Sequence, residues 1–523
     1  MIELKSYLQG KWMRGSGRVA TLLNATTEEP LANASTEGID FKLAIDFARN
    51  VGGPALRRMS FAQRGEMLRA MSRAIHAHRD ELIGLAIANG GNTRSDAKFD
   101  IDGATGTLAA YADLAPTLGD GYALTDGEGL QLGRSPRLFG AHVYVPREGV
   151  AVHVNAFNFP AWGLAEKAAT ALLAGMPVIS KPATSTALVS YRIMEILVAA
   201  AACPEGALSF IAGSTGDLLD HLTGQDVLAF TGSGATGATL RGGKAVIGNA
   251  VRVNVEADSL NAAVLGPDVE EGSDLMNLFI ADVTRDITQK TGQKCTAIRR
   301  VYAPAKTIEL VLGLIRERLE AVKVGDPSRE DVNMGPLATG QQLKDVREGA
   351  ERLATCGRVA FGGTGAISPL GGTAGKGFFM GPMLVHAPSP NAGDAIHTHE
   401  VFGPVATVMP YDGTGSGAAT LVAAGGGGLV SSVYSDDKAF VRGAVLAIAP
   451  FHGRVTIGSS KIASQAIPPG TVMPQLIHGG PGRAGGGEEL GGRRGLSFYM
   501  QRIALQGDRA LIESITAKAP TED

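Results

Sequence analysis

Between Val150 and Thr231 the sequence alternates short apolar runs with segments of helical pattern. Apolar runs of about four to eight residues are typical of strands buried in a parallel sheet, and the intervening segments carry apolar residues at helical spacing. The expected strands are 150–154, 177–180, 208–212 and 227–231, with helices at 164–173, 187–201 and 218–222. This alternation predicts a parallel, doubly wound α/β sheet.

The rest of the chain predicts further elements around that sheet. Residues 1–40 have the pattern of short strands and turns, and residues 40–115 that of two or three helices. Extended strands are expected near 132–149. A second α/β run begins near Asn261, with helices at 274–286 and 308–322 and strands at 299–302 and 405–411. A chain of 523 residues is too long for one core, so several lobes are expected.

Composition excludes several classes of partner. The net charge of −3 gives no electrostatic basis for binding nucleic acid or an anionic membrane. The N-terminus lacks the pattern of a signal peptide, and no apolar run is long enough for a membrane helix. Three scattered cysteines, Cys203, Cys295 and Cys356, do not form a disulfide framework or a zinc motif. We therefore expect a cytoplasmic protein.

Cys295 is the first candidate for chemistry. It lies in the segment Gln-Lys-Thr-Gly-Gln-Lys-Cys-Thr at 289–296, close in sequence to Lys290 and Lys294. A thiol is nucleophilic only as the thiolate, which nearby cations favour. The alternative is a small buried hydrophobic residue.

A glycine pattern follows the strand that ends at Thr231. Residues 232–237, Gly-Ser-Gly-Ala-Thr-Gly, match G-x-G-x-x-G, and glycines at this place allow backbone amides to approach a pyrophosphate. In a glycine-rich chain the pattern alone is weak, but its position after a strand of a β-α array favours dinucleotide binding.

Three further side chains follow predicted strands. Lys181 lies where open α/β sheets bind ligands, although a solvated lysine is an alternative. The Asn158 amide could donate to an oxyanion or only satisfy a turn. Glu256 ends an apolar strand, where it is either a general base or an exposed acid. His397, His399 and Glu400 do not have the spacing of a metal motif, so no metal is expected.

These stretches, in this order, resemble the aldehyde dehydrogenase superfamily over nearly the whole chain. The resemblance is carried by the Asn-Phe-Pro, Lys-Pro, Phe-Thr-Gly-Ser and Gly-Gln-Lys-Cys segments, the strand that ends in Glu256, and the Glu-Val-Phe-Gly-Pro segment at 400–404. It implies that Cys295 is the nucleophile and that Asn158 with the Cys295 backbone amide forms the oxyanion hole. It also implies that Glu256 activates the water that hydrolyses the thioester.

The resemblance further implies an NAD(P) cofactor and the residues that bind it. Lys181 and Glu400 resemble ribose contacts, Ser233 a pyrophosphate contact, and Phe402 the residue that positions the nicotinamide. The implied cofactor-binding residues are Lys181, Thr184, Gly213, Gly232, Ser233, Gly237, Glu400 and Phe402.

Two departures from the family pattern matter. The family usually has Glu-Leu-Gly-Gly where this chain has Glu-Ala-Asp-Ser at 256–259. The backbone geometry beside the expected base therefore does not follow from the family pattern. Position 184 is Thr, where members that prefer NAD commonly carry an acid that would repel a 2′-phosphate. Thr184 and Lys181 could bond that phosphate, so NADP is expected and NAD is less favoured.

A narrower resemblance concerns the substrate. Segments 255–261 and 478–492 are similar to the dehydrogenase half of the ring-cleavage enzymes of aerobic phenylacetyl-CoA breakdown, and to stand-alone relatives of the aerobic benzoyl-CoA pathway. No hydratase domain is expected here. The resemblance implies oxidation of a small-molecule CoA-linked aldehyde, 3,4-dehydroadipyl-CoA semialdehyde. The alternatives are a CoA-acylating enzyme, a semialdehyde dehydrogenase without CoA, and a non-catalytic relative.

The resemblance also implies three lobes. We expect a Rossmann-type cofactor-binding domain of residues 1–130 and 150–258 and an α/β catalytic domain of residues 259–460. A small β oligomerisation arm would comprise residues 131–149 and 461–523. Because an exposed strand pair is an unprotected edge, the arm predicts a homodimer or a dimer of dimers.

Overall fold

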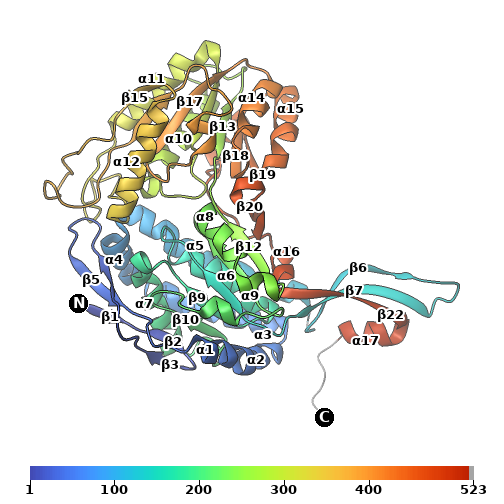
Figure 1. Ribbon diagram of the computed structural model, residues 1–523. Helices are drawn as coiled ribbons and strands as arrows, with labels where there is room; N and C mark the ends of the chain where they lie inside the picture. The colour runs from blue at the N-terminus through green and yellow to red at the C-terminus, as the bar shows by residue number, and fades with distance from the viewer. Residues whose placement is uncertain (120, 518–523) are drawn as a thin grey trace.

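The computed structural model describes residues 1–119 and 121–517, and Figure 1 shows two α/β layers with a projecting arm. The strands are β1 Ile2–Leu4, β2 Ser6–Leu8, β3 Lys11–Met13, β4 Ala20–Leu23, β5 Pro30–Ala34, β6 Leu124–Gln131, β7 Leu138–Pro146, β8 Ala151–Val154, β9 Val178–Lys181, β10 Leu208–Phe210, β11 Val227–Thr231, β12 Arg252–Glu256, β13 Ala262–Leu265, β14 Arg300–Pro304, β15 Arg358–Phe361, β16 Met383–His386, β17 Val405–Tyr411, β18 Gly428–Tyr434, β19 His452–Gly458, β20 Ile477–Gly480, β21 Gly487–Leu490 and β22 Met500–Asp508.

Helices cover both α/β layers. They are α1 Phe41–Phe47, α2 Gly53–Arg57, α3 Phe61–Ala77, α4 Arg79–Gly90, α5 Arg94–Leu114, α6 Trp162–Ala174, α7 Ala187–Ala199, α8 Gly234–Arg241, α9 Lys244–Gly248, α10 Asp274–Thr288, α11 Ile308–Glu320, α12 Gly340–Ala354, α13 Ala395–Thr398, α14 Gly415–Ala423, α15 Lys438–Ile448, α16 Arg493–Leu496 and α17 Arg509–Ala517. None of the described helices is long and apolar enough to span a membrane.

The first layer is a seven-stranded sheet in the order β12-β11-β8-β9-β10-β2-β3. Strands β8 to β12 are parallel, and the antiparallel pair β2 and β3 closes one edge. The five parallel strands and their helices follow the alternation expected from the sequence.

Neighbouring residues of these strands enter different cores, because successive side chains point to opposite faces of a sheet. Ala151 and Val178 pack in a cluster with α3, α5, α6 and α7, whereas Val152 and Ile179 pack in a cluster with α1. Burial on both faces explains the continuous apolar runs of the sequence.

The second layer is another seven-stranded sheet in the order β15-β16-β17-β14-β13-β18-β19, in which only β15 is antiparallel. Helices α10 and α11 cover one face, and α12, α14 and α15 contribute to the core on the other. A doubly wound α/β fold is therefore confirmed.

Strands β22, β7 and β6 form an antiparallel sheet that projects from the body, at the right of Figure 1. The third strand, β6, begins at Leu124, earlier than the arm boundary expected from the sequence. The segment 477–490 forms the β20–β21 hairpin, which contacts β12, β18 and β19 of the two main sheets.

The region 40–115 holds five α-helices, where two or three were expected. A π-helical turn at Ala48–Gly52 separates α1 from α2, which has Pro54 in its first turn. Gly91, with a φ of 68°, ends α4. Proline and left-handed glycine interrupt helices without changing the apolar spacing, so periodicity alone could not count them.

Candidate active site

Cys295 follows a tightly held loop after α10. Lys290 and Thr291 have φ angles of 52° and 55°, in the left-handed region that side chains other than glycine rarely adopt. The Thr291 hydroxyl donates to the Gly335 carbonyl over 2.9 Å. A Cβ on Gly292 would lie 2.1 Å from the Gly403 carbonyl oxygen, so only glycine allows this approach. The surrounding chain thus maintains a strained loop beside the thiol.

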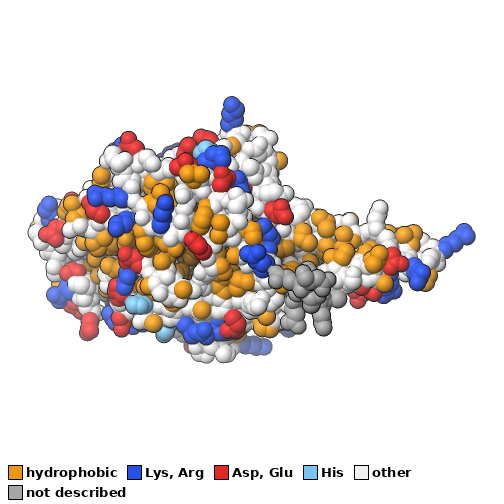
Figure 2. All heavy atoms as spheres, turned by 90° about the horizontal axis from the view of Figure 1, so that it is seen from below, with side chains coloured by type: hydrophobic (Ala, Val, Ile, Leu, Met, Phe, Trp, Pro, Cys, Tyr) orange, Lys and Arg blue, Asp and Glu red, His pale blue; other side chains and the backbone are white. Residues whose placement is uncertain are grey.

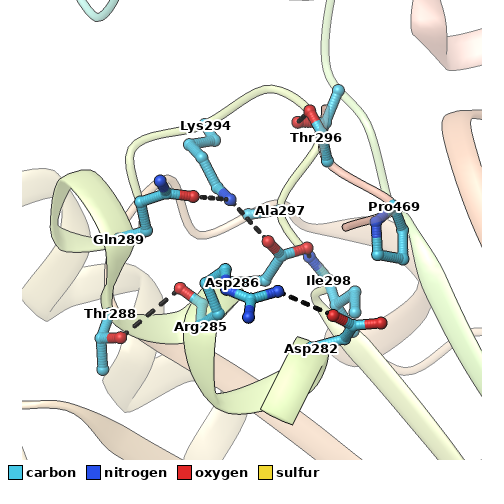
Figure 3. Close-up of polar contacts among 12 residues, drawn as sticks. Asp282, Arg285, Asp286, Thr288, Gln289, Lys294, Thr296, Ala297, Ile298 and Pro469 are labelled. Carbon is cyan, nitrogen blue, oxygen red and sulfur yellow. Dashed lines mark hydrogen bonds and ion pairs between the residues drawn. The ribbon is translucent and has the colours of Figure 1, made fainter. Parts of the chain in front are cut away.

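Lys294 anchors the same loop to α10, as Figure 3 shows. Its ammonium lies 2.5 Å from Asp286 Oδ1 and donates to Gln289 Oε1 over 2.8 Å. The second Asp286 oxygen accepts from the Ile298 amide over 3.1 Å. The Lys294–Asp286 pair therefore holds the backbone on both sides of Cys295, and the described contacts of the Lys294 ammonium are with Asp286 and Gln289.

Two other residues predicted from the sequence, Asn158 and Glu256, lie beside Cys295. Asn158 donates its amide to the Gln293 carbonyl over 2.9 Å, and Glu256 ends β12 with only 2% of its side chain exposed. Asn158, Glu256 and Cys295 line two adjoining cavities. Asn261 donates to the Cys295 carbonyl over 2.8 Å.

His478 completes this cluster and was not among the residues predicted to be catalytic. Its Nε2 lies 3.1 Å from Glu256 Oε1 and 3.8 Å from Cys295 Sγ. The sequence marked His478 only as the start of a glycine-rich segment. No local motif relates it to Glu256, because the two residues come from strands that are distant in the chain.

Burial and mutual charge set the ionisation of the cluster. Burial and the Glu256 carboxylate raise the pKa of Cys295 well above its usual value. Burial alone would raise the pKa of Glu256, but His478 and Lys167 lower it below the usual value. Burial would lower the pKa of His478, yet Glu256 raises it. The favoured state is thus a thiol beside an imidazolium–carboxylate pair.

A second buried ionic group lies behind Glu256. The Lys167 ammonium, on a side chain 1% exposed, lies 3.1 Å from Glu166 and 3.0 Å from Glu489. Burial raises the pKa of Glu489 to about 7 even though Lys167 opposes the shift. Asn254 donates to the same carboxylate over 3.0 Å. None of these residues was predicted to belong to the site.

Two cavities meet at Cys295. One is a cleft of about 640 Å³ between the two main layers. The other is a narrow cavity of about 40 Å³, mostly apolar, whose lining includes Phe99, Phe159, Trp162 and Val472. The thiol can therefore be approached from two directions by two different molecules.

The cleft is lined by the glycine pattern and the start of α8. Ser233 caps α8 by accepting from the Thr236 amide over 3.3 Å. A Cβ on Gly232 would lie 2.5 Å from the Phe230 ring, and one on Gly237 would lie 2.8 Å from Val255. The glycines thus keep α8 close to β11 and β12, with its N-terminus facing the cleft.

Lys181, Glu400 and Phe402 also line the cleft. Glu400 accepts from the Ser259 amide over 2.9 Å and lies 3.4 Å from Arg299, and its burial raises its pKa to about 7. The residues that line the cleft include neither Thr184 nor Gly213. Thr184 begins the 3₁₀ turn at Thr184–Thr186. Gly237 is not among the lining residues either, so five of the eight predicted cofactor residues line the cleft: Lys181, Gly232, Ser233, Glu400 and Phe402.

His397 and Glu400, which lack the spacing of a metal motif, each contact an arginine. His397 Nδ1 lies 3.1 Å from Arg300, and burial lowers its pKa to about 4. Glu400 faces Arg299, as described above.

Comparison with known proteins identifies the relatives of this chain. The sequence model of the aldehyde dehydrogenase family matches residues 12–504. The 3,4-dehydroadipyl-CoA semialdehyde dehydrogenase of Aromatoleum evansii is 42% identical over 480 residues, which cover 92% of this chain and 93% of that protein. The protein MaoC of Klebsiella aerogenes is 40% identical over 183 residues, 35% of this chain and 52% of that protein.

A solved structure supports the fold. A betaine aldehyde dehydrogenase variant of Staphylococcus aureus, solved with NAD⁺, superposes with a TM-score of 0.83 at 22% identity, covering 97% of this chain and 98% of that one. The resemblance found in the sequence and the expected fold class are both confirmed.

Proposed function

This chain belongs to the aldehyde dehydrogenase family, and on that premise we propose that it oxidises 3,4-dehydroadipyl-CoA semialdehyde to the carboxylic acid with NADP⁺. It is an NAD(P)-dependent aldehyde oxidoreductase. The observation that carries the proposal is the meeting of Cys295, Glu256 and Asn158 where the cleft joins the narrow cavity.

In the proposed mechanism, Cys295 supplies the nucleophile. The thiolate attacks the aldehyde carbon and gives a thiohemiacetal, which converts a difficult hydrolytic oxidation into two easier steps. The Asn158 amide and the Cys295 backbone amide stabilise the oxyanion, since fixed donors act where negative charge develops. The strained loop keeps the thiol at this position.

The residues that line the cleft suit a bound dinucleotide. The close approach at Gly232 and the N-terminus of α8 suit a pyrophosphate, and Glu400 suits a ribose hydroxyl. No described carboxylate forms an ion pair with Lys181, which leaves its ammonium for a phosphate or ribose. Phe402 would position the nicotinamide. When bound, the cofactor supplies the acceptor for the hydride whose departure turns the thiohemiacetal into a thioester.

The preference for NADP rests on Lys181 and on the absence of an acid at position 184. A carboxylate there would repel a 2′-phosphate, whereas Lys181 attracts it. Burial lowers the pKa of Lys181, and a bound phosphate would favour its charged form.

In the second half of the proposed reaction, Glu256 removes a proton from the water that attacks the thioester. Its burial and its position at the end of β12 favour general-base catalysis. The protonated His478 beside it lowers the pKa of Glu256, so the carboxylate becomes a better base when His478 is neutral. A hydrolytic enzyme needs this base, whereas a CoA-acylating enzyme would not.

The narrow cavity suits the acyl part of the substrate. Its volume of about 40 Å³ suits the aldehyde end of the chain, which would lie against the apolar lining of Phe99, Phe159, Trp162 and Val472, while the rest of the chain and the CoA part stay outside. Similarity to the Aromatoleum evansii enzyme supports the same substrate for this chain.

We also propose a homodimer joined by the strands β6, β7 and β22. The outer edges of this sheet have no strand partner among the described residues, and exposed strand edges favour pairing. Figure 2 shows hydrophobic side chains gathered along the arm. The exposed apolar side chains of this arm are Leu130, Leu132, Leu138 and Ile503. The expected domain boundaries and the cytoplasmic location remain predictions.

The test is reduction of NADP⁺ by the purified protein with the CoA-linked semialdehyde, compared with the same aldehyde lacking CoA. Preference for the CoA-linked aldehyde supports the proposed substrate, and equal rates refute it. A product that forms only when free CoA is supplied would instead identify an acylating enzyme. No reduction of NAD⁺ or NADP⁺ with any aldehyde would refute the proposed reaction.

A further inference from the structure

Asp258 places a carboxylate at the N-terminus of α8, where the proposed cofactor is expected to bind. It follows β12 within the segment 256–259, which departs from the family pattern, and it lines the cleft together with Gly232, Ser233 and Thr236. Resting on the proposed function, we propose that Asp258 limits the affinity for the cofactor by repelling its pyrophosphate, which speeds release of the reduced cofactor.

The carboxylate occupies a hydrogen-bond donor that a bound anion would use. Asp258 Oδ1 accepts from the backbone amide of Gly234, the first residue of α8, over 3.0 Å. The Thr236 amide is also taken, because it donates to the Ser233 hydroxyl over 3.3 Å. An anion at a helix N-terminus is held by free amides and by the positive end of the helix dipole. Because Asp258 already uses part of both, a pyrophosphate gains less from this helix than from an unoccupied N-terminus.

Gly234 makes room for this carboxylate. A Cβ at position 234 would lie 2.9 Å from Asp258 Oδ2, which is too close for a side-chain carbon. The glycine pattern at 232–237 therefore does more than admit a phosphate, because its second glycine also admits an acidic side chain of the protein.

The charge of Asp258 is not neutralised by a neighbouring cation. Among the residues that the structure describes, no lysine or arginine forms an ion pair with it. Arg483 lines the same cleft, but its guanidinium donates to the Thr398 carbonyl over 2.8 Å. Burial raises the pKa of Glu400, and the negative charge of Asp258 adds to this shift. Asp258 thus adds a negative charge to a cleft that is expected to hold phosphates.

This repulsion acts on a part of the cofactor that NADP⁺ and NAD⁺ share. Like charges brought together weaken binding, and most changes in affinity at one site appear in the dissociation rate. Release of product limits turnover in many enzymes, so a weaker grip on the pyrophosphate favours turnover. Asp258 should therefore lower the affinity for both cofactors by the same factor, without selecting between them.

The test is a fluorescence titration of NADPH and of NADH with the purified protein, which needs no aldehyde. Asp258→Asn keeps the size of the side chain and an oxygen that accepts from the Gly234 amide, but removes the charge. We expect this variant to bind both cofactors about fivefold to tenfold more tightly, with slower NADPH dissociation in stopped-flow measurements. The gain should shrink as ionic strength rises from about 0.01 M to about 1 M, because salt screens the repulsion.

Asp345→Asn is the matched control, because Asp345 also lines the cleft but lies on α12 and accepts from Gln341. It should leave both affinities nearly unchanged. Asp258→Ser replaces the first variant if thermal unfolding shows that Asp258→Asn is not folded.

Equal affinities of the wild type and Asp258→Asn would refute the proposal. Weaker binding by the variant would also overturn it, since the carboxylate would then accept a hydrogen bond from the cofactor. If neither NADPH nor NADH binds to the wild type, the proposed function fails together with this inference, whereas an error in the proposed aldehyde leaves the titration unaffected.

Discussion

The Lys294 ammonium lies 2.5 Å from Asp286 Oδ1, with both side chains 1% exposed, and this ion pair joins the Cys295 loop to α10. A buried ion pair is weak evidence for stability as a whole, but breaking it leaves a charge without a partner. Asp286 also accepts from the Ile298 amide on the other side of Cys295. The pair therefore connects the stability of the fold to the position of the nucleophile.

The variant Asp286→Ala should lower the free energy of unfolding by about 3–5 kcal/mol, because it leaves Lys294 buried and unpaired. Urea denaturation measures the change. The control Lys344→Ala removes an exposed pair with Glu348 and should cost less than about 1 kcal/mol. Equal effects of the two substitutions would contradict this account of the loop.

Glu400 makes stability depend on pH. Burial raises its pKa from 4.5 to about 7, so between these values the folded chain holds a proton that the unfolded chain has lost. Stability from this group is therefore lost as pH rises through that window. Glu400→Gln cannot ionise and should become more stable relative to wild type, by up to roughly 3 kcal/mol, between about pH 5 and pH 7.5.

Urea unfolding of both proteins at the two pH values checks this prediction. The exposed Glu317→Gln provides the control for loss of a carboxylate that is not buried. If the difference in stability between wild type and Glu400→Gln stays constant with pH, the raised pKa of Glu400 is wrong.

Cofactor preference should depend on Thr184 and Lys181. Thr184→Glu places a carboxylate near the expected 2′-phosphate and should lower kcat/KM with NADP⁺ by about tenfold or more, with a smaller change for NAD⁺. Lys181→Ala should raise the KM for NADP⁺ more than the KM for NAD⁺. Steady-state kinetics with both cofactors measures the ratio. Thr184 itself does not line the cleft in the described structure, but the preceding residue, Ala183, does, so a longer side chain at 184 is expected to act at this edge of the cleft. An unchanged ratio in Thr184→Glu would refute the argument.

The projecting arm predicts association. Leu130 and Leu138 are 56% and 46% exposed, and replacing both with arginine should convert the proposed dimer into monomers. Light scattering after size-exclusion chromatography measures the mass. Leu446→Arg, at a position 66% exposed on α15, is the control and should keep the wild-type mass. A monomeric wild type would contradict the dimer.

The parallel strands β8 to β12 could be predicted because each is buried on both faces and reads as an apolar run. The number of helices before residue 115 could not, because the π-helical turn at Ala48–Gly52 keeps the backbone helical between α1 and α2, so no loop in the sequence marks the boundary between them. The arm strand β6 was missed since its residues are largely exposed and carry no alternating pattern.

Part of the candidate site could also be predicted from local sequence patterns. Cys295, Glu256 and Asn158 each lie in a local sequence motif at or beyond the end of a predicted element. His478 and Lys167 take part through contacts with residues far along the chain, and such contacts depend on how β20 and α6 pack beside β12. Local sequence patterns contain no information on that packing.

The most direct test of the proposed mechanism is the first turnover of Glu256→Gln with NADP⁺ and the CoA-linked semialdehyde. A general base contributes about 10²- to 10⁴-fold, so steady-state turnover should fall by that factor while the first hydride transfer still occurs. We expect a burst of reduced cofactor approaching one equivalent per active site, with an acyl adduct on the Cys295 peptide that Cys295→Ala lacks. Turnover at the wild-type rate without an adduct would contradict the roles of Cys295 and Glu256.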